Sequence, residues 1–187
     1  MLREIINEVE LVLETTDTTF SPLAIDKGTL AMISTVGISQ SDKVLDLGCG
    51  YGVVGIYVAK LIGEHNVVMS DIDEECVRLS KSNAILNGVG GVRIVHSDGF
   101  RNMQENGFTL ILSNPPYHAD FSVAKHFIEK GFNRLVVGGK MVMVTRRKDW
   151  YKNKLMAIFG GVTIIEQDGY FVFTSEKRKV HYSNTRT

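Results

Sequence analysis

The sequence predicts an α/β domain in which a mainly parallel sheet is covered by helices on both faces and ends in an antiparallel hairpin. Short apolar runs of strand length alternate with helical stretches from Lys43 onward, and strands that are joined through helices form parallel sheets with right-handed crossovers. A glycine-rich segment, 48–52, directly follows the first of these runs. Only Gln167, Asp168 and Gly169 separate the last two runs, and so short a connection favours a hairpin.

Length and composition predict one compact domain. The 187 residues include 44% hydrophobic and 22% charged residues, which suits a single buried core. We divide residues 1–187 into a lead-in strand and helix (1–40), a core (41–176) and a basic and polar tail (177–187). The formal net charge is zero, so attraction to a polyanion requires a local patch.

The number of cysteines and the amino-terminal residues indicate in which cellular compartment the protein is expected. Cys49 and Cys76 are too few and too isolated for a disulfide framework or a metal cluster, so we expect a cytoplasmic protein that holds no metal. Residues 1–14 mix charged with apolar side chains, as neither a signal peptide nor a membrane span does. We therefore expect no membrane contact, and the sequence leaves the oligomeric state open.

Hydrophobic periodicity predicts each element in turn. A short strand at 9–13 precedes a helix at 27–36, which Asp26 caps and Gly37 ends. Seven further runs have the length and composition of strands: 44–47, 67–70, 92–95, 110–113, 140–145, 162–166 and 170–174. Four segments between them are predicted as helices: 53–62, 73–87, 123–136 and 151–159. Ligands of such sheets bind at the carboxyl ends of the strands, and the motifs fall there.

The first motif, Asp46-Leu47-Gly48-Cys49-Gly50-Tyr51-Gly52, spans the end of a strand and the start of a helix. Glycines at alternate positions allow a sharp turn and a close approach of a ligand to the backbone. The helix that follows offers unpaired amide groups and its positive dipole end, which favour an anionic group. We expect a cofactor to contact Gly48, Cys49, Gly50 and Gly52.

Two classes of cofactor fit this turn. Residues 50–55, with glycine at 50, 52 and 55, match the fingerprint of dinucleotide-binding proteins, so a nicotinamide-dependent oxidoreductase is one alternative. Asp46 weighs against it, because a carboxylate inside the strand end attracts the ammonium of an amino-acid moiety and repels a pyrophosphate. S-adenosylmethionine carries such a moiety and is the cofactor that we expect.

Two further strand ends carry acidic residues. Asp71 lies about 20 residues beyond the glycines, where an acidic side chain accepts the ribose hydroxyls of either cofactor. Ile72 is placed to lie against the adenine ring. Asp98 and Gly99 end the third strand of the core, and we expect the adenine amino group there.

The second motif, Asn114-Pro115-Pro116-Tyr117, follows an apolar strand. Two consecutive prolines keep the backbone extended and remove two amide donors, so carbonyl oxygens and the Asn114 side chain become fixed acceptors. A planar amine has two N–H groups and a weakly nucleophilic lone pair, and acceptors for its hydrogens orient it for attack. Tyr117 can stack on the flat face of the target. We predict that this loop is catalytic.

Together with Phe20-Ser21 and Asp26-Lys27-Gly28, these motifs make residues 9–176 resemble the small-domain family of class I methyltransferases. Members of that family include guanine-N2 methyltransferases of ribosomal RNA and short, stand-alone archaeal and bacterial homologues. The resemblance implies a Rossmann-like sheet of seven strands in the order 3-2-1-4-5-7-6. It also implies that the glycine turn and the aspartates bind S-adenosylmethionine, while the Asn-Pro-Pro-aromatic loop, with Asn114 near the cofactor too, holds the target nitrogen. Ribosomal members commonly carry an additional amino-terminal domain, which we do not expect here.

The expected reaction is an in-line transfer of the sulfonium methyl group to an exocyclic amine, which leaves S-adenosylhomocysteine and requires no metal. Guanine N2 in ribosomal RNA is the first choice of target. Adenine N6 and protein glutamine N5 are alternatives, because enzymes acting on them also use an Asn/Asp-Pro-Pro-aromatic loop. A cofactor-binding module without catalysis is a third class.

RNA contacts are expected outside these motifs. Arg146, Arg147 and Lys148 begin a basic segment with interleaved aromatic residues, which is typical of a surface that follows a phosphate backbone. A solvated helix face is the plainer interpretation of the same charges. Phe20 and His118 are the other candidates for substrate contact.

Overall fold

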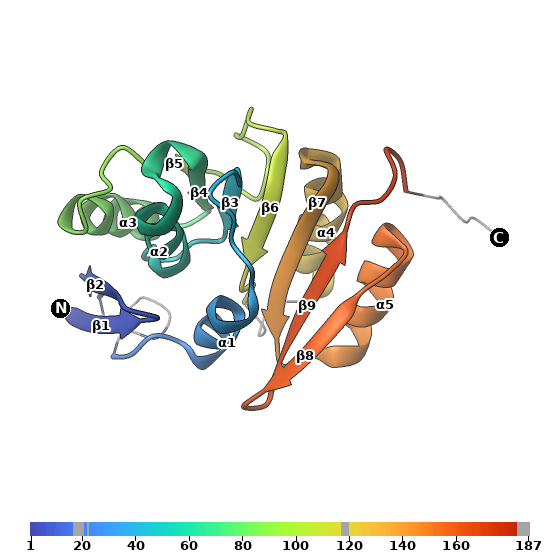
Figure 1. Cartoon of the computed structure of the whole chain (residues 1–187), viewed down its shortest axis with the longest axis horizontal. Helices are drawn as coiled ribbons and strands as arrows, with labels where there is room; N and C mark the ends of the chain where they lie inside the picture. The colour runs from blue at the N-terminus through green and yellow to red at the C-terminus, as the bar shows by residue number, and fades with distance from the viewer. Residues whose placement is uncertain (17–20, 22, 117–119, 183–187) are drawn as a thin grey trace.

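A seven-stranded sheet lies between two layers of helices (Figure 1). The structure is a computed structural model that describes residues 1–16, 21, 23–116 and 120–182. Within this part of the chain, no helix is both long and apolar enough to cross a membrane.

The sheet has the predicted topology. Its strands are β3 (Val44–Leu47), β4 (Val67–Asp71), β5 (Arg93–His96), β6 (Phe108–Ser113), β7 (Leu135–Thr145), β8 (Thr163–Gln167) and β9 (Tyr170–Glu176). They are ordered β5-β4-β3-β6-β7-β9-β8. The first five run parallel, and β9 is antiparallel to both of its neighbours. Counted from β3, this order is 3-2-1-4-5-7-6, so the expectation is confirmed.

Helices cover both faces of the sheet because its central strands are apolar on both sides. One layer contains α1 (Lys27–Thr35), α2 (Val53–Ile62) and α3 (Glu74–Leu86), and the other contains α4 (Phe121–Arg134) and α5 (Lys148–Phe159). A 3-10 turn, η1 (Glu64–Asn66), joins α2 to β4. Along β7, Val142 and Val144 belong to the core under the first layer, whereas Met141 and Met143 belong to the core under the second. This alternation is the period of two that a strand imposes.

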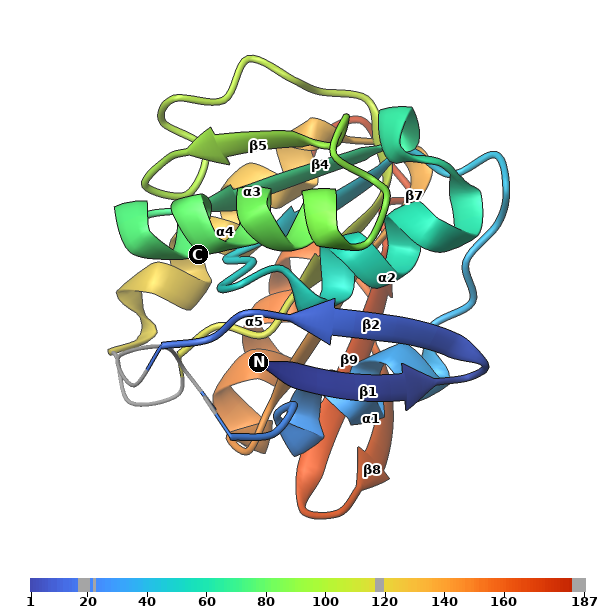
Figure 2. The ribbon, with the colours of Figure 1, turned by 90° about the vertical axis from the view of Figure 1, so that its left-hand side faces the viewer.

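An amino-terminal hairpin lies outside the main sheet. It pairs β1 (Leu2–Ile6) with β2 (Val9–Leu13), and Figure 2 shows it beside α2 and α1. Asn87, the C-cap residue of α3, holds the edge of this hairpin by accepting from the Val12 amide (3.0 Å) and donating to the Val12 carbonyl (2.7 Å). The strand at 9–13 was predicted, whereas β1 was not, because its charged and apolar residues follow no clear period.

The structure corrects several predicted boundaries. The helix predicted to reach Val136 ends at Arg134, and β7 begins at Leu135 rather than at Lys140. β-Branched residues precede Gly138, whose φ of 88° accompanies a shift in the register between β6 and β7. Helix α5 begins at Lys148, three residues earlier than predicted.

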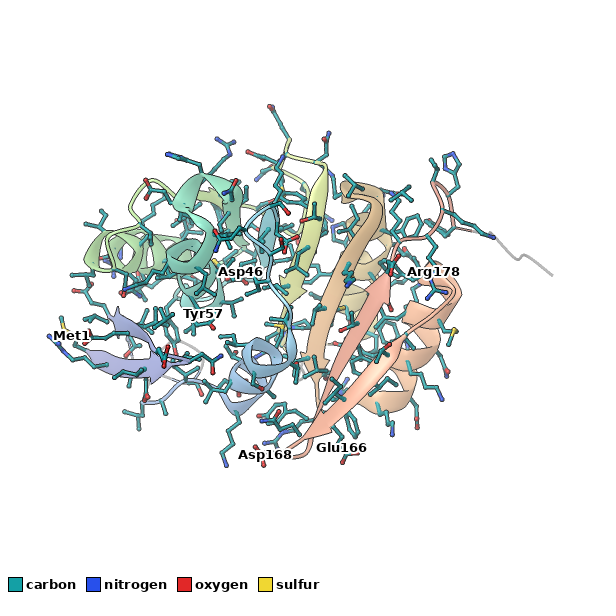
Figure 3. All side chains as sticks on the ribbon, viewed as in Figure 1. Met1, Asp46, Tyr57, Glu166, Asp168 and Arg178 are labelled. Atoms are coloured by element: carbon teal, nitrogen blue, oxygen red, sulfur yellow. The ribbon has the colours of Figure 1, made fainter. Side chains whose placement is uncertain are left out.

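The hairpin at the far edge of the sheet is confirmed. Asp168 and Gly169 form its turn with positive φ values of 51° and 77°, as two-residue hairpin turns require. Figure 3 shows Asp168 at the outer tip of this hairpin, whereas Asp46 lies well inside the molecule.

Candidate functional site

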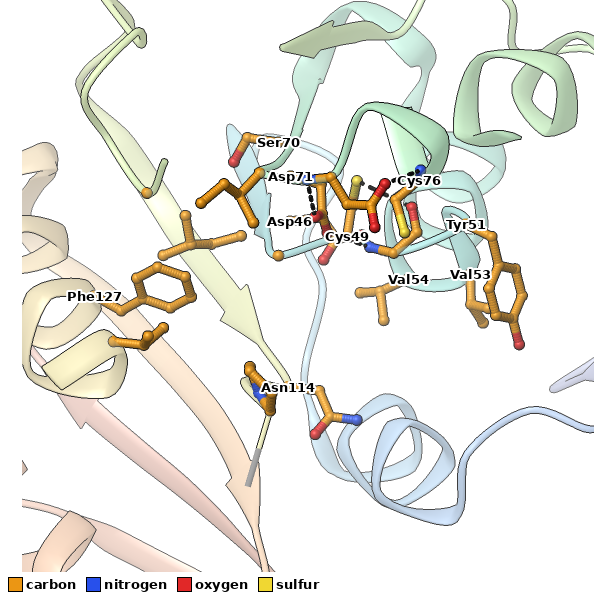
Figure 4. Close-up of a pocket in the computed structure, with 18 of the residues that line it drawn as sticks. Asp46, Cys49, Tyr51, Val53, Val54, Ser70, Asp71, Cys76, Asn114 and Phe127 are labelled. Carbon is orange, nitrogen blue, oxygen red and sulfur yellow. Dashed lines mark hydrogen bonds between the residues drawn. The ribbon is translucent and has the colours of Figure 1, made fainter. Parts of the chain in front are cut away.

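A cavity of about 410 Å³ opens at the carboxyl ends of β3, β4, β5 and β6. This is the place where an open parallel sheet binds its ligands. Figure 4 shows the glycine turn with Asp46 and Asp71 on one side of the cavity, Phe127 of α4 on another, and Asn114 near α1.

Three backbone amides of the glycine turn are already hydrogen-bonded to other parts of the protein. Gly48 and Cys49 both donate to the Ser70 carbonyl at 2.9 Å, and Gly50 donates to Oδ2 of Asp71 at 2.8 Å. Gly48 and Gly50 have φ values of 76° and 55°, which explains why glycine is needed at both positions. Each of these three amides already has an acceptor, so they are not among the unpaired amides that the sequence predicts at the start of the helix that follows.

Gly52 has a different place from the one expected. It is not among the described residues that line the cavity. A Cβ atom there would lie 2.9 Å from Cδ1 of Ile56 and 3.0 Å from Cε of Met69, and the φ of Gly52 is 102°. The structure thus places Gly52 where α2 packs against β4, and a side chain at this position would point into the core.

Asp46 lies at the floor of the cavity. Only 2% of its surface is exposed, and Oδ2 accepts a hydrogen bond from the Gly55 amide at 2.8 Å. Burial raises the pKa of Asp46 from its ordinary value of 3.8 to about 7; the Gly55 amide opposes this shift and the nearby Asp71 carboxylate adds to it. A cationic group arriving beside Asp46 would complete the solvation that the ionised form lacks.

Asp71 is held in place by two backbone amides. Its Oδ2 accepts from Gly50, and its Oδ1 accepts from Asp73 at 3.0 Å. Ile72, a hydrophobic residue that is 62% exposed, follows it in the cavity wall. Asp98 and Gly99 also line the cavity, and Oδ2 of Asp98 lies 2.8 Å from the Arg101 guanidinium.

The cavity is acidic. Among the described residues that line it there is neither lysine nor arginine, whereas five are aspartates: Asp26, Asp46, Asp71, Asp73 and Asp98. Burial, reinforced by these carboxylates, raises the pKa of the Cys49 thiol well above its ordinary value and that of Cys76 to about 12. Both thiols are therefore protonated near neutral pH, which is contrary to what a nucleophilic cysteine needs.

Asn114 directly follows β6 and reaches toward α1. Its Nδ2 donates to Oδ2 of Asp26 at 2.9 Å and to Oγ1 of Thr29 at 3.0 Å. Asn114 and Pro116 line the cavity, while Pro115 is buried and is not part of the described lining. Tyr117, His118 and Phe20 lie outside the described residues.

Several lining residues were not predicted. Asp26 and Thr29 were expected only to belong to a capped helix, and Val123 and Phe127 only to an ordinary amphipathic helix. The resemblance through Asp26-Lys27-Gly28 was the one sequence signal that could have drawn attention to Asp26. No sequence pattern marked Val123 and Phe127, because their access to the cavity depends on how α4 crosses the sheet.

The basic segment lies against aromatic rings. The three charged groups lie 4.6 to 5.0 Å from ring centroids, namely Arg146 over Tyr170, Arg147 over Phe121 and Lys148 over Phe171. All three basic residues are exposed. They are not among the described residues that line the acidic cavity.

The fold and the acidic cavity define a class I methyltransferase. The sequence profile of the methyltransferase small domain family matches residues 10–175. The chain therefore belongs to this family, and the predicted family, fold and class of enzyme are confirmed.

Relatives and solved structures agree with this assignment. The chain is 31% identical over 164 residues to the uncharacterized protein YbxB of Bacillus subtilis, covering 84% of this chain and 82% of that protein. It is 31% identical over 166 residues to ribosomal RNA small subunit methyltransferase C of Serratia proteamaculans, covering 87% of this chain and 47% of that protein.

A T. thermophilus 16S rRNA N2 G1207 methyltransferase, solved with AdoMet and guanosine, superimposes with a TM-score of 0.85 at 26% identity. The match covers 95% of this chain and 50% of that one. The chain thus spans about half the length of the relatives that are named as ribosomal RNA methyltransferases.

Proposed function

We propose that this protein transfers the methyl group of S-adenosylmethionine to the exocyclic N2 of a guanine in ribosomal RNA. The observation that carries the proposal is the acidic cavity beside Asn114-Pro115-Pro116. S-adenosylmethionine brings a sulfonium and an ammonium against one carboxylate, and five aspartates favour such a net cation. A nicotinamide dinucleotide brings a pyrophosphate, which these carboxylates would repel.

Each part of the cofactor has a matching group in the cavity. Asp46 is assigned to the ammonium, and Asp71, held by two amides, to the ribose hydroxyls. Ile72 and Asp98 are assigned to the adenine ring and its amino group. The glycine turn supplies close approach, with positive φ at Gly48 and Gly50.

The target nitrogen is assigned to Asn114. Both N–H groups of its side-chain amide point to Asp26 and Thr29, so Oδ1 is the atom left to accept from the amine. An acceptor on the amine orients the nitrogen toward the methyl group and stabilises the positive charge that develops on it. The protein's part is alignment and electrostatics, since the cofactor supplies the methyl group.

RNA is assigned to the basic and aromatic surface at the start of α5. Phe121 and Trp150 stack with centroids 4.3 Å apart and an interplanar angle of 13°, and Arg147 lies over Phe121. Phe121 is the first residue of α4 and follows the Asn114 loop closely in the chain. Cationic side chains beside aromatic rings suit single-stranded RNA, whose bases stack and whose phosphates attract arginine and lysine. A cytoplasmic location is part of the proposal, because ribosomal RNA acts there.

The test compares the modified nucleosides of ribosomal RNA from a deletion strain and from its parent by mass spectrometry. The proposal expects one N2-methylguanosine to disappear and to return when the gene is restored on a plasmid. An unchanged set of guanine modifications, or the loss of an N6-methyladenosine instead, contradicts it.

A further inference from the structure

The acceptor Oδ1 of Asn114 has a fixed direction only if something prevents its side-chain amide from rotating by half a turn. A free asparagine interchanges its oxygen and its NH2 group at little cost, because the two are similar in size. In the rotated form the NH2 group would face the target amine, and two donors would meet. Some other residue must therefore hold the amide.

Asp26 meets this need. A carboxylate accepts hydrogen bonds and cannot donate them, so the amide of Asn114 must present Nδ2 to Asp26, as the 2.9 Å contact shows. Thr29 takes the second N–H at 3.0 Å. The same Oδ2 of Asp26 accepts from the Thr29 backbone amide at 3.0 Å and so caps α1.

Tyr170 and Arg146 hold the other side of that carboxylate. The Tyr170 hydroxyl donates to Oδ1 of Asp26 at 3.2 Å and accepts from Nη2 of Arg146 at 3.2 Å. Burial raises the pKa of Tyr170, which keeps its hydroxyl protonated and able to donate. The Arg146 guanidinium also lies 4.6 Å from the centre of the Tyr170 ring.

Gly28 leaves the space that this arrangement needs. A Cβ atom at Gly28 would lie 2.7 Å from two carbons of the Tyr170 ring and 2.8 Å from Oδ2 of Asp26. Tyr170 begins the last strand and lies 144 positions from Asp26 in the sequence. Segments far apart in the chain therefore converge behind Asn114, on the side that its amide nitrogen faces.

We propose that Asp26 is a positioning residue that fixes the orientation of the Asn114 amide, and that Tyr170 and Arg146 in turn hold Asp26. This inference rests on the proposed function for its catalytic consequence, while the orientation itself is a property of the free protein. It also gives Arg146 a role apart from its neighbours in the basic segment, because Arg146 donates to the Tyr170 hydroxyl, which in turn donates to Asp26.

The decisive variant is Asp26→Ser. Serine caps a helix about as well as aspartate, so the fold should keep its stability. Its hydroxyl can accept from the Thr29 amide and still either donate to Asn114 or accept from it, so it no longer enforces one orientation. We expect the single-turnover rate of methyl transfer to ribosomal RNA from the deletion strain, measured at saturating S-adenosylmethionine, to fall about tenfold or more. Tyr170→Phe, which keeps the ring and removes the hydroxyl, should give a smaller loss in the same direction.

A second change that restores the donor–acceptor pair distinguishes positioning from general damage. Asn114→Asp alone brings two carboxylates together and should nearly abolish transfer, because they repel each other and share a proton. Asp26→Ser combined with Asn114→Asp gives a hydroxyl that can accept from the Thr29 amide and donate to the new carboxylate, and its transfer rate should exceed that of Asn114→Asp by about tenfold. Asp42→Ser is the matched control, since this aspartate accepts from Ser39 and Thr109 in a loop away from the described lining of the cavity.

A spectroscopic measurement makes the outcome independent of the substrate. In the ¹⁵N spectrum of the free protein, the side-chain NH2 signal of Asn114, identified by its loss in Asn114→Ala, should move in Asp26→Ser and in Tyr170→Phe but not in Asp42→Ser. A signal that stays in place in both variants, or a double variant no faster than Asn114→Asp, overturns the positioning role. If the parent methylates no guanine while the signal moves as expected, the proposed function fails and the positioning role stands.

Discussion

The end of the cavity that we assign to the cofactor and the end that we assign to the target are built in different ways; we call them the cofactor end and the target end. At the cofactor end, Asp46, Gly50 and Asp71 belong to strands and turns that are close in the chain. Backbone amides hold the carboxylates of the two aspartates. At the target end, side chains hold side chains, and Asn114 lies 88 positions from Asp26. The first arrangement is local and resists substitution of its surroundings, whereas the second depends on the packing of the whole domain. On this assignment, we expect substitutions to change the specificity for the target more readily than the cofactor site.

The largest effect should come from the target end. Asn114→Ala removes the acceptor that acts on the amine as it attacks, so the single-turnover rate of methyl transfer should fall about a hundredfold or more. Calorimetric titration with S-adenosylmethionine should give nearly the parental affinity. Parental transfer together with weak cofactor binding would reverse the roles assigned to the two ends.

The next effect tests the cofactor end. Asp71→Ala removes a charged acceptor and should weaken S-adenosylmethionine binding by about 1.5 to 3 kcal/mol in calorimetry. Asp71→Asn, which keeps an acceptor but loses the charge, should lie between this variant and the parent. Thermal unfolding is the control, because Asp71 also holds the Gly50 amide. Unchanged affinity in Asp71→Ala would remove this residue from the site.

A change of pH should also affect the cofactor end more than the target end. Cofactor binding requires ionised Asp46, whose pKa burial raises to about 7, so affinity should be about tenfold weaker at pH 6 than at pH 8. Between about pH 4 and 7 the folded protein binds more protons than the unfolded chain, so the contribution of this group to the stability of the free protein falls as pH rises. Asp46→Asn should remove the dependence of affinity on pH in this range, and a slope that survives in this variant would show that another group is responsible.

The smallest effect should come from the basic surface. Replacing Arg147 and Lys148 by alanine should weaken RNA binding several-fold and flatten its dependence on salt, because fewer counterions are released. Affinity for S-adenosylmethionine should be unchanged. Binding measured by fluorescence anisotropy at several salt concentrations gives the slope, and a slope equal to that of the parent would make these residues a solvated helix face.

The same contrast explains what could be predicted from the sequence. The β3 strand, the α2 helix and the acidic strand ends follow from short-range patterns, namely an apolar run, glycines at fixed spacing and a carboxylate at each strand end. The bonds of Asp26 with Asn114 and Tyr170 follow only from the crossing of α1 over β7 and β9, which local periodicity does not encode. Gly52 matched the motif but serves packing, since a glycine pattern does not distinguish a ligand from a neighbouring side chain.

The central claim is the transfer of a methyl group to guanine N2, and isotope labelling tests it most directly. The purified protein is incubated with S-adenosylmethionine carrying a deuterated methyl group and with ribosomal RNA from the deletion strain, and the digested nucleosides are analysed by mass spectrometry. We predict that the deuterated methyl group appears in N2-methylguanosine, and that Asn114→Ala lowers its yield. Label in N6-methyladenosine, label only in protein, or no transfer at all by a protein that binds the cofactor would contradict the proposed function.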